Sequence, residues 1–483
     1  MKKDFIAVVV LVLIVVIFAS LLFANNYISP KATPALTPAQ TYVGVTYSGN
    51  SLVEAKLLID KVKTYTNLFV VQSGELEKNT SELTKICNYA ICSGLHIIVY
   101  FSAVPTYRQY ITAFLEDAKN FGSNLLGIYF DDEPGGKILD SQQTIYFYDN
   151  STKNIIMKSQ KFLGTTQADG TATYYIDDGS VEVHGSFSVF YESNTTISKE
   201  DALIGLTSAK YLVKSNGTIF VRDSNGALIA PLNDNEIISK IETYGQIIAK
   251  KPFQTYDEAA RIFVSTLQNS TSWPHSQTSV PLFTSDYALY WYDYLGGYDV
   301  VLAELGWNST SEQQIASVRG AANLQSKDWG VIITWKYSQP PYLVNGTEMY
   351  DQMRFAYENG AKYLVVFNYP TFPDANPFGI LQNEHFEALQ RFWNDTVNNQ
   401  TLTPGIIKAD TVLVLPENYG WGLRSLQDNI WGLWQADDRS SQVWVSMKNA
   451  LETYGSRLDI TYSNQMFFAQ EKYRKIIYWN QTS

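Results

Sequence analysis

The sequence predicts an α/β fold: a (β/α)8 barrel with a β-rich insertion after its fourth strand and a small α/β domain at its carboxyl end, behind one N-terminal transmembrane helix. Three observations lead to this prediction. Eight short apolar runs are each followed by a helical pattern, a polar stretch with alternating segments interrupts the fourth of these units, and a long uncharged run opens the chain. Eight strand-helix units are the number that closes a parallel barrel.

The eight predicted strands are apolar runs of four to seven residues. They lie at Tyr42 to Tyr47, Leu68 to Gln72, His96 to Ser102, Leu125 to Phe130, Pro281 to Thr284, Val300 to Ala303, Val331 to Thr334 and Tyr363 to Phe367. Apolar residues at spacings of three and four between these runs predict helices. Such helices are expected at Leu52 to Tyr65, Tyr107 to Phe121, Ser311 to Gln325, Thr347 to Asn359 and Gln382 to Asn394. The barrel is therefore assigned to residues 42–399.

Two regions depart from this pattern. Residues 136–234 are rich in Thr, Ser and Tyr and alternate between polar and apolar positions, which predicts antiparallel strands. These strands could form a lid over the barrel mouth, a substrate-binding wall, or a subdomain without a role at the site. A helix is expected from 235 to 269. Residues 404–483 show strand patterns at Thr411 to Leu415, Leu458 to Thr461 and Lys475 to Tyr478 around a helical segment, Gln442 to Tyr454. This order resembles a flavodoxin-like layer of the amidotransferase-like kind found behind some β-galactosidase barrels.

The chain has no charged residue between Phe5 and Phe23, and Lys2 and Lys3 come before this run. The run is long enough to cross a bilayer, and the lysines favour a cytoplasmic amino terminus. We therefore predict a transmembrane anchor at 1–26 with the lipid bilayer as its partner, a Pro/Thr-rich linker at 27–41, and a body outside the cytoplasm. Cleavage as a signal peptide near Ala19 or Ala24 stays open.

Sequons and cysteines also indicate on which side of the membrane the body lies. Asn-x-Ser/Thr sequons exceed the roughly five expected by chance, which favours a glycosylated extracytoplasmic surface. They begin at Asn79, Asn150, Asn194, Asn216, Asn269, Asn308, Asn345, Asn394, Asn399 and Asn480. The cysteines, Cys87 and Cys92, could close a small disulfide or remain free thiols.

Composition excludes some functions. The net charge of -11 and the lack of a basic stripe argue against a nucleic-acid partner. Zinc is not expected because the histidines are scattered without ligand spacing, at His96, His184, His275 and His385. No P-loop or serine-nucleophile elbow is present, and we predict no cofactor. The aromatic content of 14% suits the binding of sugar rings, although most such residues pack in cores.

The strongest chemical signal is Asp131-Asp132-Glu133 followed by Pro134, directly after the apolar run that ends at Phe130. The carboxyl ends of barrel strands are where barrel enzymes carry their catalytic residues. Closely packed carboxylates raise at least one pKa, so that an acid and a base can coexist near neutral pH. The three acids could instead form a solvated turn or hold a hard cation.

A glycosidase needs two carboxyl groups, one as acid and one as nucleophile or base. Glu133 is the predicted general acid/base, and Asp131 or Glu304 is its predicted partner. Glu304 closes the run Val-Val-Leu-Ala, and Lys336 is expected to pair with it and favour its ionised form. Other strand-end acids are Glu75 and Asp286. The remaining predicted substrate contacts are Asp132, Tyr100, Asp286, Trp335, Lys336, Tyr337, Asn368 and Tyr369.

These residues resemble motifs of barrel-type glycoside hydrolases. Gly127 to Pro134 is similar to the strand-four motif D-G-x-D-x-D-x-E of family 18 chitinase-like enzymes, whose last Glu is the proton donor. Asp131 and Glu133 match its end, whereas Leu126 and Tyr129 replace the earlier acids. The same residues resemble the Asn-Glu-Pro of the large retaining clan, with Asp132 in place of Asn and with Lys336 on strand seven, where that clan has its nucleophile.

A third arrangement, that of α-galactosidase-like barrels, places carboxylates on strands four and six and would use Glu304. The resemblance implies a glycosidase acting on an oligo- or polysaccharide or a glycoconjugate. The alternative is a non-catalytic cell-surface glycoprotein or glycan-binding protein on a barrel scaffold.

Overall fold

The structure is a computed structural model that describes residues 41–103, 107–140, 255–307, 309–370, 376–467 and 469–481 in full, together with the backbone of strands between 144 and 251. Its centre is a closed barrel of eight parallel strands in the order β1-β19-β18-β17-β16-β4-β3-β2. The strands are β1 (Tyr42–Tyr47), β2 (Leu68–Val71), β3 (His96–Phe101), β4 (Leu125–Phe130), β16 (Leu282–Asp286), β17 (Val300–Leu305), β18 (Asp328–Ile333) and β19 (Tyr363–Val366). The predicted barrel is confirmed, and each strand lies within a few residues of its expected position.

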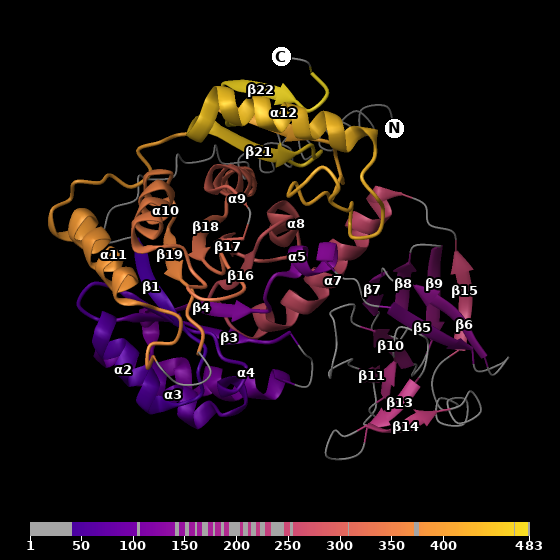
Figure 1. The fold of residues 1–483 in the computed structure, drawn as a ribbon, viewed down its shortest axis with the longest axis horizontal. Helices are drawn as coiled ribbons and strands as arrows, with labels where there is room; N and C mark the ends of the chain where they lie inside the picture. Colours follow the sequence, from indigo (N-terminus) through magenta and orange to yellow (C-terminus); the bar gives the residue numbers. More distant parts are fainter. Residues whose placement is uncertain are drawn as a thin grey trace, which may run out of the picture.

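Helices surround the barrel (Figure 1). They are α2 (Leu52–Val62), α3 (Thr80–Cys92), α4 (Arg108–Asp117), α5 (Pro134–Asp140), α7 (Tyr256–Gln277), α8 (Tyr290–Leu295), α9 (Ser311–Gln325), α10 (Gly346–Glu358) and α11 (Asn383–Trp393). The starts of four of them are fixed by side chains that accept a backbone N–H of the first turn, which satisfies a donor that the helix itself leaves free. These N-cap residues are Ser51, Asn79, Thr255 and Asn345.

The barrel interior is filled by side chains, so that chemistry is confined to its ends. The interior cluster is aliphatic and aromatic and comprises Leu68, Val70, Ile98, Tyr129, Phe283, Val300, Leu302, Ile332, Tyr363 and Val365. A larger apolar layer lies between the strands and the helices. Cys87 is buried and Cys92 is exposed, and both are free thiols, so the disulfide alternative is wrong for this structure.

The region between β4 and β16 contains three antiparallel sheets separate from the barrel sheet, with orders β11-β10-β5-β6, β12-β13-β14 and β15-β9-β8-β7. Their strands are β5 (Thr144–Asp149), β6 (Asn154–Ser159), β7 (Phe162–Thr166), β8 (Ala172–Ile176), β9 (Gly179–His184), β10 (Ser188–Glu192), β11 (Leu203–Gly205), β12 (Tyr211–Val213), β13 (Ile219–Arg222), β14 (Leu228–Leu232) and β15 (Gln246–Lys251). The helix expected from 235 to 269 is wrong in its first part, because β15 pairs there with β9 and sheet pairing overrides the local pattern.

The C-terminal residues form a parallel sheet, β21-β20-β22, with helix α12 packed against it. The elements are β20 (Thr411–Leu415), α12 (Asp438–Tyr454), β21 (Leu458–Tyr462) and β22 (Lys475–Tyr478). This layer lies over α9 in Figure 1. The contact is close, because a Cβ at Gly320 of α9 would lie 2.4 Å from the carbonyl oxygen of Ile460 in β21.

A buried ion pair fixes the same contact. Arg319 of α9 donates from Nε to Asp459 Oδ1 of β21 at 2.6 Å, and its Nη2 donates to the carbonyl oxygens of Ser456 and Leu458. The aromatic segment between β20 and α12 also packs rather than faces solvent, since Tyr419, Trp421 and Trp431 are each at most 1% exposed. The barrel and the C-terminal layer therefore share one continuous core.

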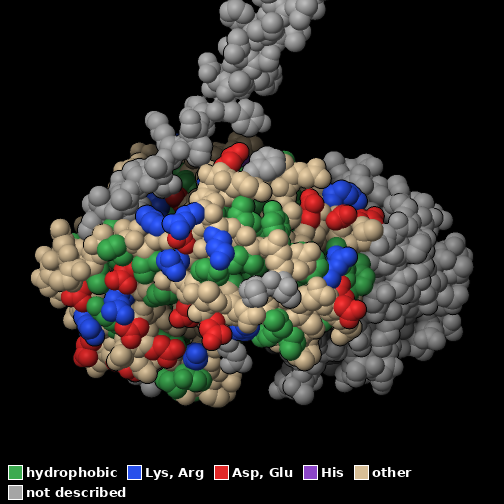
Figure 2. All heavy atoms as spheres, turned by 90° about the horizontal axis from the view of Figure 1, so that it is seen from above, with side chains coloured by type: hydrophobic (Ala, Val, Ile, Leu, Met, Phe, Trp, Pro, Cys, Tyr) green, Lys and Arg blue, Asp and Glu red, His purple; other side chains and the backbone are tan. Residues whose placement is uncertain are grey.

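The described surface carries acidic and basic side chains interspersed over the face shown in Figure 2. Within the described residues, no helix combines the length and apolar character needed to cross a bilayer. The predicted anchor at 1–26 and the linker at 27–41 lie, apart from Thr41, outside the described residues.

Candidate active site

The three acids that follow β4 lie at the carboxyl end of the barrel. The N–H of Asp131 donates to the carbonyl of Phe101 at 3.0 Å, and the N–H of Glu133 donates to the carbonyl of Ser285 at 2.9 Å. Asp131 and Glu133 both adopt left-handed backbone conformations, with φ of 62° and 51°. Such conformations are uncommon outside glycine and concentrate at functional sites, where the surrounding structure holds them.

Glu133 and Glu304 come together at this end of the barrel. Their side chains lie close enough for each carboxyl to influence the pKa of the other, although β16 lies between their strands. Glu304 is only 5% exposed, and burial raises the pKa of both carboxyls; the charge of Asp132 adds to the rise for Glu133, and the charge of Glu133 adds to it for Glu304. Two carboxyls that influence each other in this way titrate as a pair, so they are best treated as a single unit. Among the described residues, no hydrogen bond links the carboxyl of Asp131 to Glu133.

A buried hydroxyl network extends from this pair. Ser285 Oγ donates to Glu304 Oε1 at 2.7 Å and lies 3.2 Å from Asp132 Oδ1. The hydroxyl of Tyr129 contacts both Ser285, at 2.8 Å, and Asp132. Sequence reasoning missed Ser285 and Tyr129. A hydroxyl at the end of an apolar strand, directly before Asp286, was the available signal for Ser285.

Asp286 does not contact substrate as predicted, because it is fully buried and its carboxylate accepts four backbone N–H groups. The donors are Gly135, Gly136, Tyr287 and Ala288, at 2.5 to 3.1 Å. Burial raises the pKa of Asp286 to about 7 against the opposing effect of these donors. Asp293 is also fully buried, and burial, with the nearby Asp286 carboxylate adding to the effect, raises the pKa of Asp293 well above its usual value. Asp286 therefore fixes the start of α5, directly after Glu133.

Lys336 does not pair with Glu304. Its Nζ lies 3.7 Å from Glu348 Oε1, on α10. The prediction that Lys336 keeps Glu304 ionised is therefore wrong, because β18 directs the lysine toward the outer helix and burial raises the pKa of Glu304 instead.

Some of the other predicted rim residues are exposed to a ligand, and others are packed or hold a loop. Tyr100 lies beside the acids, with its ring edge-on to Tyr129 at 5.5 Å. Trp335 packs against Phe367 and Tyr369, at centroid distances of 5.5 and 6.0 Å. Tyr337 and Tyr369 are each 47% exposed, whereas Asn368 is 5% exposed and its Oδ1 accepts the N–H of Ile380. Tyr337 and Tyr369 are thus available to a ligand, and Asn368 holds a loop.

A cleft of about 540 Å³ opens beside Glu133, between the barrel and the C-terminal layer. Its volume falls in the range typical of ligand sites, roughly 300 to 1,000 Å³. Its lining combines aromatic, hydroxyl, amide and charged side chains: Glu133, Asp140, Tyr287, Trp307, Ser309, Thr310, Gln313, Gln314, Arg424, Ser425, Trp444 and Lys448. Of these, sequence reasoning found only Glu133, because residues that follow different strands meet only in the folded chain.

Trp307 is the exposed aromatic of this cleft, at 45%. Its backbone is left-handed, with φ of 47°, and its N–H donates to the carbonyl of Trp335 at 2.7 Å. A bulky residue in this conformation is held there by its surroundings. Within the described residues, no group of three or more His, Cys, Asp or Glu side chains is arranged to hold a metal ion.

Neither a family model nor a curated protein matches the sequence. Among solved structures, a GH5_18 glycoside hydrolase from Streptomyces cattleya in complex with GlcNAc is 10% identical, with a TM-score of 0.49 over 92% of this chain and 99% of its own. A GH5_18 variant from Bifidobacterium longum in complex with Manβ1-4GlcNAc is 8% identical, with a TM-score of 0.42 over 91% and 96%. A D-psicose 3-epimerase is 9% identical, with a TM-score of 0.31 over 74% and 99%. These likenesses carry no activity over to this chain.

Proposed function

We propose that the protein is a glycoside hydrolase, with Glu133 as general acid/base and Glu304 as its partner. The observation that carries this proposal is the meeting of two buried carboxyls at the barrel mouth, beside a cleft that Glu133 lines. Burial raises the pKa of both groups, which favours the retention of a proton by one of them. A protonated carboxyl can donate to a glycosidic oxygen while an ionised one attacks the sugar or activates water.

The positions of the two carboxyls assign their roles. Glu133 lies on the cleft and is the proton donor. Glu304 lies deeper, and burial raises its pKa well above the usual value; the hydrogen bond from Ser285 opposes this rise and favours the ionised form that a nucleophile needs. The close approach of the two carboxyls supports the short separation of a retaining enzyme, about 5 to 5.5 Å, over the roughly 6.5 to 9.5 Å that an inverting enzyme needs for its water. The proposed reaction is a double displacement with retention of configuration.

The substrate is an oligo- or polysaccharide or a glycoconjugate that occupies the cleft. The faces of Trp307 and Trp444 suit the apolar faces of sugar rings, and Ser309 and Thr310 offer hydroxyl contacts. The β-rich region between β4 and β16 follows α5 directly in the sequence, which supports its assignment as a lid or a further wall of the site.

The test is hydrolysis of a panel of glycans by the purified body, residues 42–483, with products separated by chromatography. Glu133→Gln should lower the rate by about 10²- to 10⁴-fold, because it removes the proton and keeps the shape. Glu75→Gln is the matched control, since Glu75 is exposed after β2 and should leave the rate unchanged. A glycan bound but never cleaved would support the non-catalytic glycan-binding alternative, and full activity of Glu133→Gln would refute the assignment.

We further propose that the body is displayed outside the cytoplasm on the anchor at 1–26. The uncharged run after Lys2 and Lys3 supports this, as does the sequon excess. The sequon asparagines that the structure describes are all exposed, namely Asn79, Asn269, Asn345, Asn394, Asn399 and Asn480. Protease added to intact cells should digest the body, and full protection of the chain would overturn the proposed topology.

A further inference from the structure

We propose that the C-terminal layer holds the general acid in place through helix α5, with Arg424 as the positioning residue that links them. This inference rests on the proposed function of Glu133. The carbonyl of Glu133 accepts the N–H of Lys137 at 2.9 Å, so Glu133 belongs to the first turn of α5. Any shift of α5 therefore moves the backbone that carries the acid.

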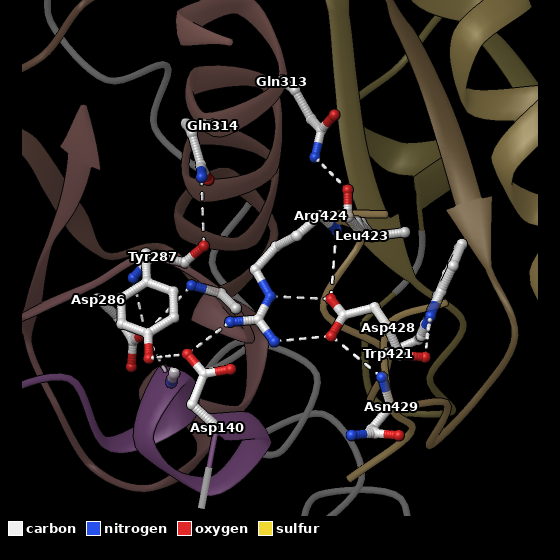
Figure 3. A network of polar contacts seen from close by, with 12 residues as sticks. Asp140, Asp286, Tyr287, Gln313, Gln314, Trp421, Leu423, Arg424, Asp428 and Asn429 are labelled. Atoms are coloured by element: carbon white, nitrogen blue, oxygen red, sulfur yellow. Dashed lines mark hydrogen bonds and ion pairs between the residues drawn. The ribbon is translucent and has the colours of Figure 1, made fainter. Parts of the chain in front are cut away.

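Arg424 connects the two regions through a fixed fork of hydrogen bonds (Figure 3). Its Nε and Nη2 donate to the carboxylate of Asp428 at 2.9 and 2.6 Å, within the C-terminal layer. Its Nη1 donates to Asp140 Oδ2, the last residue of α5, at 2.7 Å. Because Asp428 binds two N–H groups along one edge of the planar guanidinium, the third bond, from Nη1, has a defined direction. Asp140 is thereby held at a set position relative to the C-terminal layer.

Tyr287 also holds Asp140, at the end of α5, in place. Its hydroxyl donates to Asp140 Oδ2 at 2.6 Å, and the Arg424 guanidinium lies 5.5 Å from its ring centroid. A Cβ at Gly136 would lie 2.1 Å from the tyrosine ring, so the ring lies directly against the start of α5. Figure 3 shows Tyr287, Asp140 and Arg424 side by side.

The C-terminal chain also contacts the backbone of α5. A Cβ at Gly432 would lie 2.0 Å from the carbonyl oxygen of Ile138, and Gly432 has φ of +69°. A Cβ at Gly422 would lie 2.7 Å from the buried side chain of Leu139. Gln313 of α9 donates to the carbonyl of Leu423 at 2.7 Å, which fixes this chain segment to the barrel.

Helix α5 is thus held at both ends by different parts of the molecule. The barrel holds its start, through the carboxylate of Asp286, and the C-terminal layer holds its end, through Arg424. With seven residues, α5 has too few internal hydrogen bonds to keep its own position. The C-terminal layer, which carries no predicted catalytic group, therefore belongs to the catalytic unit.

Two variants test the link. Asp140→Ala removes the bonds from Arg424 and Tyr287 to α5 and keeps the Arg424 to Asp428 pair, whereas Arg424→Ala removes the Asp428 pair and the Arg424 bond to α5 and keeps the Tyr287 bond. Arg457→Ala is the control, because Arg457 forms only a 3.7 Å exposed pair with Asp410 in the same layer. Arg424→Lys keeps the positive charge but cannot form the same set of directed hydrogen bonds, so it should recover little of the activity that Arg424→Ala loses.

The expected signature is that of a displaced proton donor. With a glycoside whose leaving group needs protonation, kcat should fall roughly 10- to 100-fold in both variants, since displacement of a catalytic group by about 1 Å can cost 10²-fold. With a dinitrophenyl glycoside, whose leaving group needs no proton, the rate of glycoside cleavage should change less than threefold, and KM should stay constant. Hydrogen exchange of residues 134–140 should speed up in both variants and not in Arg457→Ala.

A rise in KM with both substrates at unchanged kcat would make Arg424 a substrate contact and overturn the proposal. Unchanged exchange in α5 in both variants would overturn it as well. A wild-type chain that cleaves no glycoside would instead refute the proposed function, and the exchange measurement would still decide whether Arg424 holds α5.

Discussion

The hydroxyl of Ser285 donates to Oε1 of Glu304 at 2.7 Å, across neighbouring strands β16 and β17. This bond favours the ionised form of Glu304 in a site where burial and the Glu133 and Asp132 carboxyls oppose it. The Ser285 hydroxyl thereby makes it easier for Glu304 to lose its proton.

Ser285→Ala should raise the pKa of Glu304 and move the acid limb of the rate profile to higher pH. The loss of one hydrogen bond costs about 0.5 to 1.5 kcal/mol, which corresponds to a shift of up to roughly one pH unit. The measurement is kcat/KM against pH. Ser73→Ala is the control, because Ser73 is also buried and follows β2. An acid limb that stays in place would show that Ser285 does not tune the pair.

The products should retain the anomeric configuration of the substrate. The close approach of Glu133 and Glu304 favours a nucleophile over the wider gap, with its water, that inversion needs. Proton NMR of the first-formed sugar, recorded before mutarotation, distinguishes the two outcomes. A product of inverted configuration would mean that the carboxyls separate on binding and that Glu304 acts as a base.

Glu304→Gln should stabilise the fold more as the pH rises. The native state binds the Glu304 proton more tightly than the unfolded chain, because burial raises its pKa. The wild type is therefore most stable, as far as this group is concerned, below the ordinary pKa of about 4.5, and it loses that contribution as the pH rises above it. The glutamine of the Glu304→Gln variant does not titrate, so the variant loses no stability from this position as the pH rises.

Thermal melting of the two proteins between pH 4 and pH 8 checks this. The melting temperature of Glu304→Gln relative to wild type should increase with pH, whereas Glu312→Gln, at an exposed position of α9, should show no such trend. A constant difference across the range would contradict a raised pKa for Glu304.

The buried pair of Arg319 and Asp459 should make a large contribution to stability. The two side chains are 4% and 0% exposed, and removing one partner leaves the other charged and buried. Arg319→Ala should lower the free energy of unfolding by about 3 to 5 kcal/mol. Arg457→Ala, which breaks an exposed pair, should cost no more than about 1 kcal/mol. Urea denaturation followed by tryptophan fluorescence provides both values, and equal costs would contradict a special role for Arg319.

The barrel was predictable because its signal is local. Each strand is a short apolar run buried on both faces, such as Leu125 to Phe130, and each is punctuated by polar helical segments. The order of elements along the chain then permits few topologies other than a closed parallel barrel. Glu133 and Glu304 were found for the same reason, since each directly follows or ends such a run.

The β15 strand was not predictable in this way, because its pattern is not distinctive and its partner is β9, more than 60 residues away. The partners of charged side chains were also not predictable from the sequence. Glu304 lies at the end of β17 and Lys336 follows the neighbouring strand β18, yet the lysine side chain pairs with Glu348 on α10. The position of Asp286 at a strand end predicts a substrate contact, whereas in the structure four backbone N–H groups bind its carboxylate.

The sequence by itself determined the barrel, its strand ends and the acids that those ends present, because hydrophobic periodicity and strand order are properties of neighbouring residues. The tertiary structure alone decided which acids meet, which are buried, and that Arg424 reaches α5 from a segment more than 280 residues further along the chain. Burial, hydrogen bonding and pKa depend on distances between residues that the sequence keeps far apart, and only the folded chain sets those distances.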